Sequence, residues 1–418
     1  MIINADLHIH SYFSRAPGDK ITVVVPSNTS NKISIAAISL EAPRKGIDIV
    51  GSGDCLHSGW IREIKTCNKV DDGTFELNGT RFILSTEIET KNRVHHLLFF
   101  PSFSAVEEFK RIIKHFSKNL EIDGRPNVNM GGEELASIAR EVWALIGPAH
   151  VFTPRTSIYA HYGSLRECYG DLADYVSFVE LGLSADSDYA DKIQELHRLT
   201  FLTNSDSHSP HPVRFAREFN RFEVRDVTFN EIKKAILRIG GNKPVLNVGL
   251  PPQEGKYNES ACVSCHTHYT LEEALHRNWK CSCGKRIKKG LKDKINEHAT
   301  FSKPHHPDHR PPYVHLIPLP EIITKAVGQR NPFTETTSRR WDELVSEFGS
   351  EINILLDVDV SDIAKVTVPA VTEAIKAFRE RKAVINPGGG GKYGTIEFPF
   401  EGDMLTISLA HGEIDGCH

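Results

Sequence analysis

The first 245 residues alternate between short apolar runs and segments of helical periodicity, and this alternation limits the folds open to the chain. Strands are predicted within the apolar runs 1–10, 47–54, 81–89, 94–101, 145–150, 175–181 and 199–208. Helices are predicted within 104–116, 132–144, 189–199 and 229–239. Such alternation favours an α/β fold, most simply a distorted barrel, in which the working residues lie at the carboxyl ends of the strands.

Side chains of types that bind metals lie at the ends of these seven runs. The residues are His8 and His10, Asp54 and His57, Glu87 and Glu89, His95 and His96, His150, Glu180, and Asp206 and His208. Side chains at alternate strand positions share a face, so His8 and His10 are expected to hold one cation together, with Asp6 behind them. Imidazole and carboxylate suit zinc, manganese or iron, and this many ligands exceeds one coordination sphere. We therefore expect two or three clustered ions, an arrangement typical of phosphate ester hydrolysis.

A cysteine cluster indicates a second metal site. Its members are Cys262, Cys265, Cys281 and Cys283. The C-x2-C-x15-C-x-C spacing is close to that of a zinc ribbon, although the second pair is one residue shorter than usual. His266 or His268 is an alternative to one of the sulfur ligands, and four unrelated thiols are the alternative without metal. The sequence thus predicts one structural zinc, and the lack of a signal peptide favours reduced thiols.

A basic run follows the cysteines and is a candidate contact for a polyanion. Between Lys280 and Lys294, seven lysines and arginines accompany the single acid Asp293. The net charge of the whole chain is -4, so a polyanion site must be local. A solvated surface is the alternative interpretation. The candidate phosphate contacts are Lys285, Arg286, Lys288 and Lys289.

The C-terminal third is predicted to be mostly helical and to contain a glycine-rich loop. A Gly/Pro-rich linker is expected over residues 240–257, and the chain is expected to divide into a barrel (1–245), a cysteine module (257–297) and a C-terminal region (298–418). The loop residues are Gly388, Gly389, Gly390, Gly391, Lys392 and Tyr393. Glycine allows the backbone to approach a ligand closely, and a cation beside an aromatic ring suits the phosphate and base of a nucleotide. A simple flexible turn is the alternative.

Six motifs resemble those of the PHP (polymerase and histidinol phosphatase) domain. They are "DLHIHS", "GSGDCLH", "TEIE", "VHH", "GPAH" and "NSDSH". The chain departs from that pattern at Arg15, where the family often has aspartate, and at Cys55, where a histidine often follows the aspartate. With "GLSADSD", "EFNRFEVRDVTF" and "PGGGGKYG" added, the order of domains resembles the endonuclease Q family over nearly the whole chain. That resemblance implies a nuclease that nicks DNA on the 5′ side of hypoxanthine, uracil, xanthine and abasic sites.

The metal ligands and the resemblance together predict a metal-dependent endodeoxyribonuclease. Two or three zinc, magnesium or manganese ions are expected, and Asp206, His8 and His10 are expected to be central to catalysis. The damaged base is expected to flip out of the duplex towards the glycine-rich loop. The predicted ligands are His8, His10, His57, Glu87, His95 or His96, His150, Asp206 and His208.

Two other classes of function remain open from the sequence. A small-molecule phosphoesterase of the histidinol-phosphatase type explains the metal ligands but leaves the C-terminal regions without a role. A non-catalytic zinc-ribbon protein that binds DNA is the other. No apolar run approaches the roughly 20 residues of a membrane helix, so we expect a cytoplasmic, nucleoid-associated protein with DNA as its partner and no membrane contact. A sliding clamp is a further partner suggested by family analogy alone.

Overall fold

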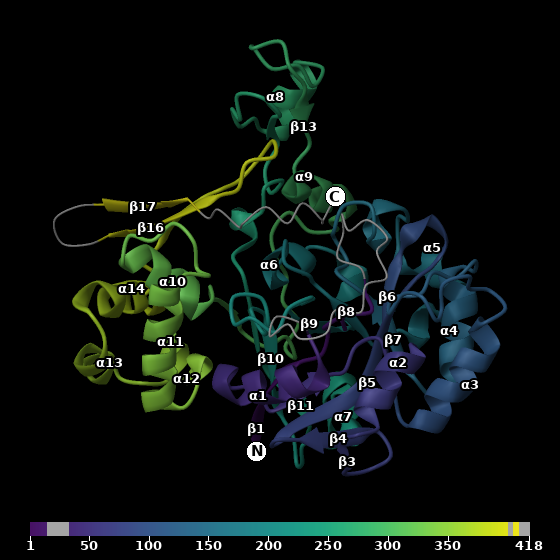
Figure 1. Cartoon of the computed structure of the whole chain (residues 1–418). Helices are drawn as coiled ribbons and strands as arrows, with labels where there is room; N and C mark the ends of the chain where they lie inside the picture. Colours follow the sequence, from purple (N-terminus) through teal and green to yellow (C-terminus); the bar gives the residue numbers. More distant parts are fainter. Residues whose placement is uncertain (15–32, 400–403, 409–418) are drawn as a thin grey trace.

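The computed structural model describes residues 1–14, 33–399 and 404–408. It shows an α/β barrel with two appended parts, a cysteine module at one end and a group of helices at one side (Figure 1). Within these described ranges, no helix is both long and apolar enough to cross a membrane. The expected fold class, a distorted barrel with a cysteine module and a mostly helical C-terminal region, is confirmed.

A ten-stranded sheet forms most of the barrel wall, in the order β14-β11-β10-β1-β2-β5-β4-β3, with β6 and β7 continuing from β5. Strands β1, β2 and β5 are parallel, whereas β5, β6 and β7 are antiparallel. The parallel pair β8 and β9 completes the wall, because β8 contacts β7 and β9 contacts β11. The strands are β1 (Ile2–Asp6), β2 (Ile49–Gly51), β3 (Asn68–Lys69), β4 (Thr74–Leu77), β5 (Thr80–Glu89), β6 (His95–Phe100), β7 (Leu145–Pro148), β8 (Phe178–Glu180), β9 (Thr200–Leu202), β10 (Phe219–Glu223), β11 (Lys243–Gly249) and β14 (Tyr313–His315).

Helices cover the outside of the barrel. They are α1 (Ile35–Lys45), α2 (Ser58–Ile64), α3 (Phe103–Ile113), α4 (Gly132–Glu141), α5 (Leu165–Tyr169), α6 (Ser187–Ala190) and α7 (Phe229–Leu237). Five of them begin where a side-chain oxygen accepts a backbone N–H of the first turn, at Ser34, Ser102, Ser164, Asp186 and Thr228. Their apolar faces pack on the strands, so the predictions of helices within 104–116, 132–144 and 229–239 are confirmed.

The prediction of a helix within 189–199 is wrong. This stretch contains the end of the short α6 and a 3₁₀ turn instead. The carboxylate of Asp191 is fully buried, and Arg310 donates to it at 2.9 Å. Tertiary contacts of this kind override a local periodicity.

Two expectations about the strands also need correction. Strand β1 ends at Asp6, so His8 and His10 lie just beyond its end rather than within it. The segment 240–257, expected to be a linker, includes all of β11, which pairs with both β10 and β14. The predicted domain boundary at 245 therefore falls inside a strand of the sheet.

The cysteine module projects from the barrel beside α6 (Figure 1). It consists of β12 (Ala261–Cys262), α8 (Leu271–His276), β13 (Ile287–Lys288) and α9 (Leu291–His298). Its small apolar core, formed around Cys262, Ala274 and Ile287, is separate from the core of the barrel. So small a core is consistent with a module that depends on a metal for stability.

The C-terminal region contains a group of five helices, of which α12 contacts α1 of the barrel, and a three-stranded antiparallel sheet follows them. One continuous apolar core includes Trp60 of the barrel together with Trp341 and Phe378 of these helices. The elements are α10 (Leu319–Ala326), α11 (Glu335–Phe348), α12 (Glu351–Leu356), α13 (Val360–Val366), α14 (Pro369–Arg379), β15 (Val384–Asn386), β16 (Thr395–Pro399) and β17 (Met404–Ser408).

Candidate metal centre

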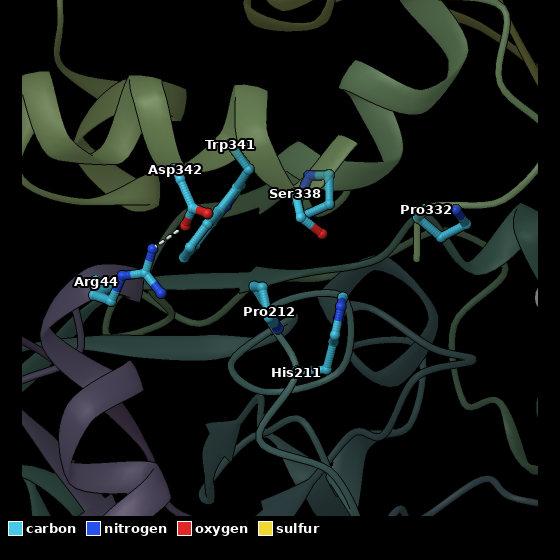
Figure 2. Close-up of a pocket in the computed structure, with 8 residues that line it drawn as sticks. Arg44, His211, Pro212, Pro332, Ser338, Trp341 and Asp342 are labelled. Atoms are coloured by element: carbon cyan, nitrogen blue, oxygen red, sulfur yellow. Dashed lines mark hydrogen bonds and ion pairs between the residues drawn. The ribbon is translucent and has the colours of Figure 1, made fainter. Parts of the chain in front are cut away.

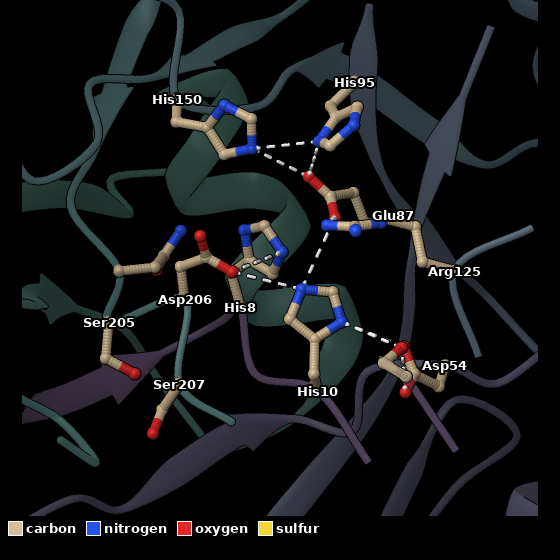
Figure 3. A network of polar contacts seen from close by, with 12 residues as sticks. His8, His10, Asp54, Glu87, His95, Arg125, His150, Ser205, Asp206 and Ser207 are labelled. Atoms are coloured by element: carbon tan, nitrogen blue, oxygen red, sulfur yellow. Dashed lines mark hydrogen bonds and ion pairs between the residues drawn. The ribbon is translucent and has the colours of Figure 1, made fainter. Parts of the chain in front are cut away.

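Five histidines and two carboxylates meet at one end of the barrel (Figure 3). They form three groups whose ligand atoms lie within 4.8 Å of one another. His10 and Glu87 each belong to two groups, so neighbouring ions would share ligands. The groups are His8, His10 and Glu87; His10, Asp206 and His208; and Glu87, His95 and His150.

Several buried polar atoms in this cluster have no hydrogen-bond partner among the described residues. They are Nε2 of His8, Nε2 of His10, Nδ1 of His150, Nδ1 of His208 and Oδ1 of Asp206. His10 Nε2 lies 3.0 Å from Asp206 Oδ1, but the pair does not have hydrogen-bond geometry. Leaving buried polar atoms unpaired costs folding free energy. These atoms are imidazole nitrogens and a carboxylate oxygen, which are ligand atoms that bind zinc and manganese. The residues therefore fit a cluster of divalent ions.

The opposite ring nitrogens of two histidines face carboxylates that orient them. Glu180 lies 2.9 Å from His8 Nδ1 and also accepts the backbone N–H of His150 at 2.9 Å. Asp54 lies 3.2 Å from His10 Nδ1 and accepts both the N–H and the hydroxyl of Ser11. Carboxylates in this position hold an imidazole with its free nitrogen aimed at the metal.

Asp6 performs a similar supporting role behind the opening histidines. Its two oxygens accept the backbone N–H of Ser205 at 3.1 Å and the Ser205 hydroxyl at 2.6 Å. Since Ser205 precedes Asp206 directly, these bonds brace the loop that presents Asp206 to the cluster.

The backbone is strained at three residues of the site. Asp54, His150 and Asp206 have φ values of 45°, 29° and 47°, in a region of backbone conformation that residues other than glycine seldom occupy. Strained conformations of this kind persist where the surrounding structure enforces them, and they concentrate at functional sites. Here all three residues follow a strand and turn their side chains towards the cluster.

The electrostatic field of the cluster favours a cation. Burial disfavours the charged form of His8, yet the carboxylates of Glu180 and Asp206 raise the pKa of His8 to about 9. Burial also opposes ionisation of Glu87, but His95 and Arg125 hold its pKa well below the usual range. Burial and the charge on His10 lower the pKa of His208 to about 3, which leaves that imidazole neutral and able to coordinate.

The structure places two predicted ligands outside the cluster. His57 Nδ1 accepts the backbone N–H of Gly59 at 3.2 Å, and its Nε2 lies 3.1 Å from the carbonyl of Glu121. With both nitrogens occupied, this ring caps α2 and stacks on Phe13. His96 points to the other face of β6, where it contacts Tyr169 and Thr90. We therefore exclude His57 and His96 from the proposed ligand set.

His95 is the member of the adjacent pair that faces the site, as the alternation of a strand requires. Its Nδ1 lies 2.8 Å from Glu87 Oε1, and its Nε2 lies 3.1 Å from Glu89 Oε2. Asp54 orients His10 and belongs to none of the ligand groups among the described residues. Arg15, the other departure from the family pattern, lies outside the described residues.

Arg125 also lies at the cluster, and sequence reasoning missed it. Its Nη1 is 3.2 Å from Glu87 Oε2 (Figure 3). The residue is in the connection between α3 and α4, which has no strand end and no recognised motif. No pattern in the sequence predicts that this loop crosses the end of the barrel.

The four cysteines of the module converge as predicted. The Sγ atoms of Cys262 and Cys283 lie 3.5 Å apart, and those of Cys265 and Cys281 lie 3.4 Å apart. All four belong to one ligand group, whereas His268 pairs with Glu259 instead. Four sulfurs at these distances suit one tetrahedral ion.

The glycine-rich loop is packed against the segment before the cysteine module. Its amides donate to chain carbonyls, that of Gly388 to Gln253 at 2.8 Å and that of Gly391 to Lys256 at 2.9 Å. A Cβ at Gly390 would lie 2.2 Å from the carbonyl oxygen of Cys262. The glycines therefore permit close packing, which leaves Lys392 and Tyr393 as the candidate substrate contacts of this loop.

The basic run contributes to a cationic surface that extends to the barrel. Lys285 and Arg286 are exposed, and Lys289 pairs with Glu297. Burial, together with the charges of Arg155, Lys294, Arg286 and Lys256, lowers the pKa of Lys288. Arg155 lies in the loop that follows β7 and contains His150, so this loop of the barrel contributes to the same surface.

Comparison with known sequences finds relatives without an assigned role. Residues 318–382 match the family described as the MJ0043 C-terminal domain. The uncharacterised protein MJ0043 of Methanocaldococcus jannaschii is 46% identical over 59% of this chain, and the match covers 31% of the length of MJ0043. The uncharacterised protein YqxK of Bacillus subtilis is 30% identical over 94% of this chain and 99% of its own length.

Two crystal structures match almost the whole chain. The lesion-specific endonuclease PfuEndoQ from Pyrococcus furiosus is 47% identical, with a TM-score of 0.89 and coverage of 99% of this chain and 98% of that one. An endonuclease Q in complex with a 27-mer duplex, which has an abasic lesion at the active site, is 48% identical, with a TM-score of 0.86 and coverage of 96% and 98%. The barrel and both appended parts are thus shared with these proteins.

Proposed function

This chain belongs to the endonuclease Q family, and on that premise we propose that it is a metal-dependent endonuclease that cuts DNA at damaged nucleotides. The observation that carries the proposal is that the unpaired Nε2 atoms of His8 and His10 face Asp206, and that of His10 also faces Glu87, within the three ligand groups. The proposed lesions are deaminated bases, namely hypoxanthine, uracil and xanthine, and abasic sites, with cleavage on the 5′ side. An abasic duplex is the substrate bound in one of the similar crystal structures.

The mechanism assigns two kinds of role to the residues of the metal centre. Divalent ions held at this site, zinc, magnesium or manganese, would provide activation of a water molecule at neutral pH and neutralisation of phosphate charge. Glu180 and Asp54 orient the imidazoles. Asp206, with a side chain 24% exposed, would hold an ion and position the attacking water. The residues that would hold the ions are His8, His10, Glu87, His95, His150, Asp206 and His208.

Substrate recognition is assigned to the appended parts. The cationic surface around Lys288 and Arg155 would neutralise DNA phosphates, and such contacts position a duplex without reading its bases. A base inside a duplex is out of reach of a pocket, so the damaged nucleotide would flip out, and a mispaired base does so at lower cost. Lys392 and Tyr393 are the proposed contacts of the flipped nucleotide.

A nicking assay tests the proposal. Labelled duplexes carrying one inosine, uracil or abasic site, and an undamaged duplex, would be incubated with magnesium, manganese or zinc. We expect a single nick 5′ of the lesion, and we expect Asp206→Asn to abolish it while DNA affinity stays close to that of the wild type. Cleavage of the undamaged duplex at the same rate would contradict lesion specificity.

The same assay separates the other two functions. Turnover of a free phosphomonoester without nicking would favour a phosphatase of the histidinol-phosphatase type. Tight DNA binding by metal-free protein, without any hydrolysis, would favour a non-catalytic DNA-binding protein.

A further inference from the structure

Arg125 lies at the solvent side of the metal centre. Its side chain is 23% exposed, and that of Asp206 is 24% exposed, whereas those of His10 and Glu87 are fully buried. Figure 3 shows Asp206 and Arg125 flanking His10. A molecule that enters from solvent would therefore meet this guanidinium and this carboxylate before the buried ligands.

The loop that carries Arg125 is held at several points. The backbone N–H of Arg125 donates to the Asp123 carboxylate at 3.1 Å, and Gly124 N–H donates to the Phe13 carbonyl at 3.1 Å. A Cβ at Gly124 would lie 2.2 Å from Asp54 Oδ2, so this close approach requires glycine. The end of β5 holds the loop on its other side, because Glu89 N–H donates to the Pro126 carbonyl. The guanidinium is thus presented by a rigid support, not by a free loop.

The contacts of Glu87 do not require Arg125 as a partner. Glu87 Oε1 lies 2.8 Å from both His95 Nδ1 and His150 Nε2, and Oε2 lies 3.4 Å from His10 Nε2. Arg125 adds one contact from Nη1, and no other side-chain hydrogen bond of this guanidinium occurs among the described residues. Several of its five N–H donors therefore remain available to a ligand.

We propose that Arg125 is a catalytic residue that binds a non-bridging oxygen of the scissile phosphate. A guanidinium matches phosphate geometry with paired N–H donors, and a preorganised donor stabilises the extra negative charge of the transition state. The inference rests on the proposed function, since it takes a phosphodiester as the substrate. The alternative is that Arg125 only balances the charge of Glu87.

Single-turnover cleavage of the abasic duplex by Arg125→Ala, Arg125→Lys and the wild type tests the inference. The loss of one such donor is expected to lower the rate by about 10²–10³-fold. Bound metal per chain should be unchanged in Arg125→Ala, and the inhibition constant of inorganic phosphate should rise. Added guanidinium ion should restore part of the rate of Arg125→Ala but not of Arg125→Lys. Arg93→Ala is the matched control, because Arg93 is 60% exposed and lies 3.7 Å from Glu89, outside the ligand groups.

Two outcomes would overturn the inference. Cleavage by Arg125→Ala at the wild-type rate would show that the guanidinium does not act on the phosphate. Loss of bound metal without rescue by guanidinium would assign Arg125 to charge balance. Hydrolysis of bis(p-nitrophenyl) phosphate, measured in parallel, distinguishes failure of the inference about Arg125 from failure of the proposed function. Failure of the wild type to nick DNA would refute the proposed function, whereas the ratio of variant to wild-type rates on this small diester still decides the role of Arg125.

Discussion

Lys45 and Glu351 form a buried ion pair that joins the barrel to the C-terminal helices. Their side chains are 1% and 2% exposed, and Lys45 Nζ lies 2.7 Å from Glu351 Oε1. Lys45 also donates to the carbonyl of Pro212 at 2.8 Å, and Glu351 Oε2 accepts the indole N–H of Trp341 at 2.7 Å. A pocket of about 200 Å³ lies beside this pair, between His211, Pro212 and Trp341 (Figure 2). The pair therefore braces the loop that follows Asp206 and His208.

Replacing one member of this pair should destabilise the protein strongly. Lys45→Met leaves the Glu351 carboxylate buried without its charge partner, a change that typically costs about 3–5 kcal/mol. The measurement is the shift in the denaturant midpoint of unfolding. Lys69→Met is the matched control, because Lys69 pairs with Asp72 at an exposed position, where an ion pair contributes about 0–1 kcal/mol. Equal midpoints for Lys45→Met and the wild type would contradict the prediction.

His95 and His57 should differ in their effect on the catalytic metals. His95→Asn removes an imidazole that lies among the ligands, whereas His57→Asn changes a ring whose nitrogens contact backbone groups. Metal analysis should therefore find fewer ions per chain in His95→Asn and the wild-type number in His57→Asn. A loss of metal in His57→Asn would show that His57 is a metal ligand.

The strand ends allowed most of the proposed ligands to be predicted from sequence. His8, Glu87 and Asp206 follow or lie near the carboxyl ends of their strands. His95 begins β6, which is antiparallel to β5 and sets His95 opposite Glu89. The position of His57 could not be predicted, because it depends on whether the ring faces the cluster or caps the next helix. Local patterns do not contain that information.

Long-range contacts explain what the sequence could not reveal of the fold. Strand β11 pairs with Tyr313–His315 across a long interval, and its own residues include a proline and an asparagine, which are uncommon in strands. Backbone amides of the glycine-rich loop donate to the carbonyls of residues 253–256. Arg125 reaches the site through a loop that hydrogen bonds to Phe13 and Glu89 hold. Each of these contacts joins segments whose pairing no local periodicity specifies.

The cysteine cluster should hold one zinc that is distinct from the catalytic ions. Hydrogen bonds from Thr267 lower the pKa of the Cys265 thiol to about 6, which favours the thiolate that binds zinc. Cys265→Ser should lose about one zinc per chain and make residues 257–297 sensitive to proteolysis, because the binding energy of such a site is folding energy. Cys67→Ser is the control, as that thiol lies in the barrel core. Unchanged zinc content in Cys265→Ser would refute the prediction.

Glu218 should make stability fall as pH rises. Burial raises the pKa of this carboxyl to about 8 from an ordinary value of 4.5, and its Oε2 has no hydrogen-bond partner among the residues described. Between these pH values the unfolded chain releases the proton and the folded chain keeps it, so the free energy of unfolding decreases with increasing pH. Glu218→Gln keeps an oxygen for the N–H of Leu250 and removes the titration. Its Tm should fall less than that of the wild type between pH 5 and pH 8.

The matched control for this titration is Glu223→Gln, since Glu223 is 48% exposed. Its pH profile should follow that of the wild type. Parallel profiles for Glu218→Gln and the wild type would show that Glu218 does not retain its proton in the folded state.

The basic run should supply salt-dependent affinity without lesion specificity. Replacing Lys285, Arg286, Lys288 and Lys289 by glutamine should weaken binding to intact and abasic duplexes alike, because phosphate contacts position DNA but do not read it. The slope of log K against log salt should become shallower by up to about 0.9 for each lost contact. Lys285 and Arg286 are both exposed, so their double substitution should account for much of this change.

Tyr393 provides the contrasting case. Its ring lies 5.6 Å from the ammonium of Lys256, beside the segment that leads into the cysteine module. If this residue contacts the flipped nucleotide, Tyr393→Ala should reduce the preference for abasic over intact DNA and leave the salt slope almost unchanged.

The double substitution of Lys69 and Lys243, on β3 and β11, is the charge control for Lys285 and Arg286. An unaltered salt slope in the four-residue variant would mean that the run is a solvated surface and that the DNA path lies elsewhere.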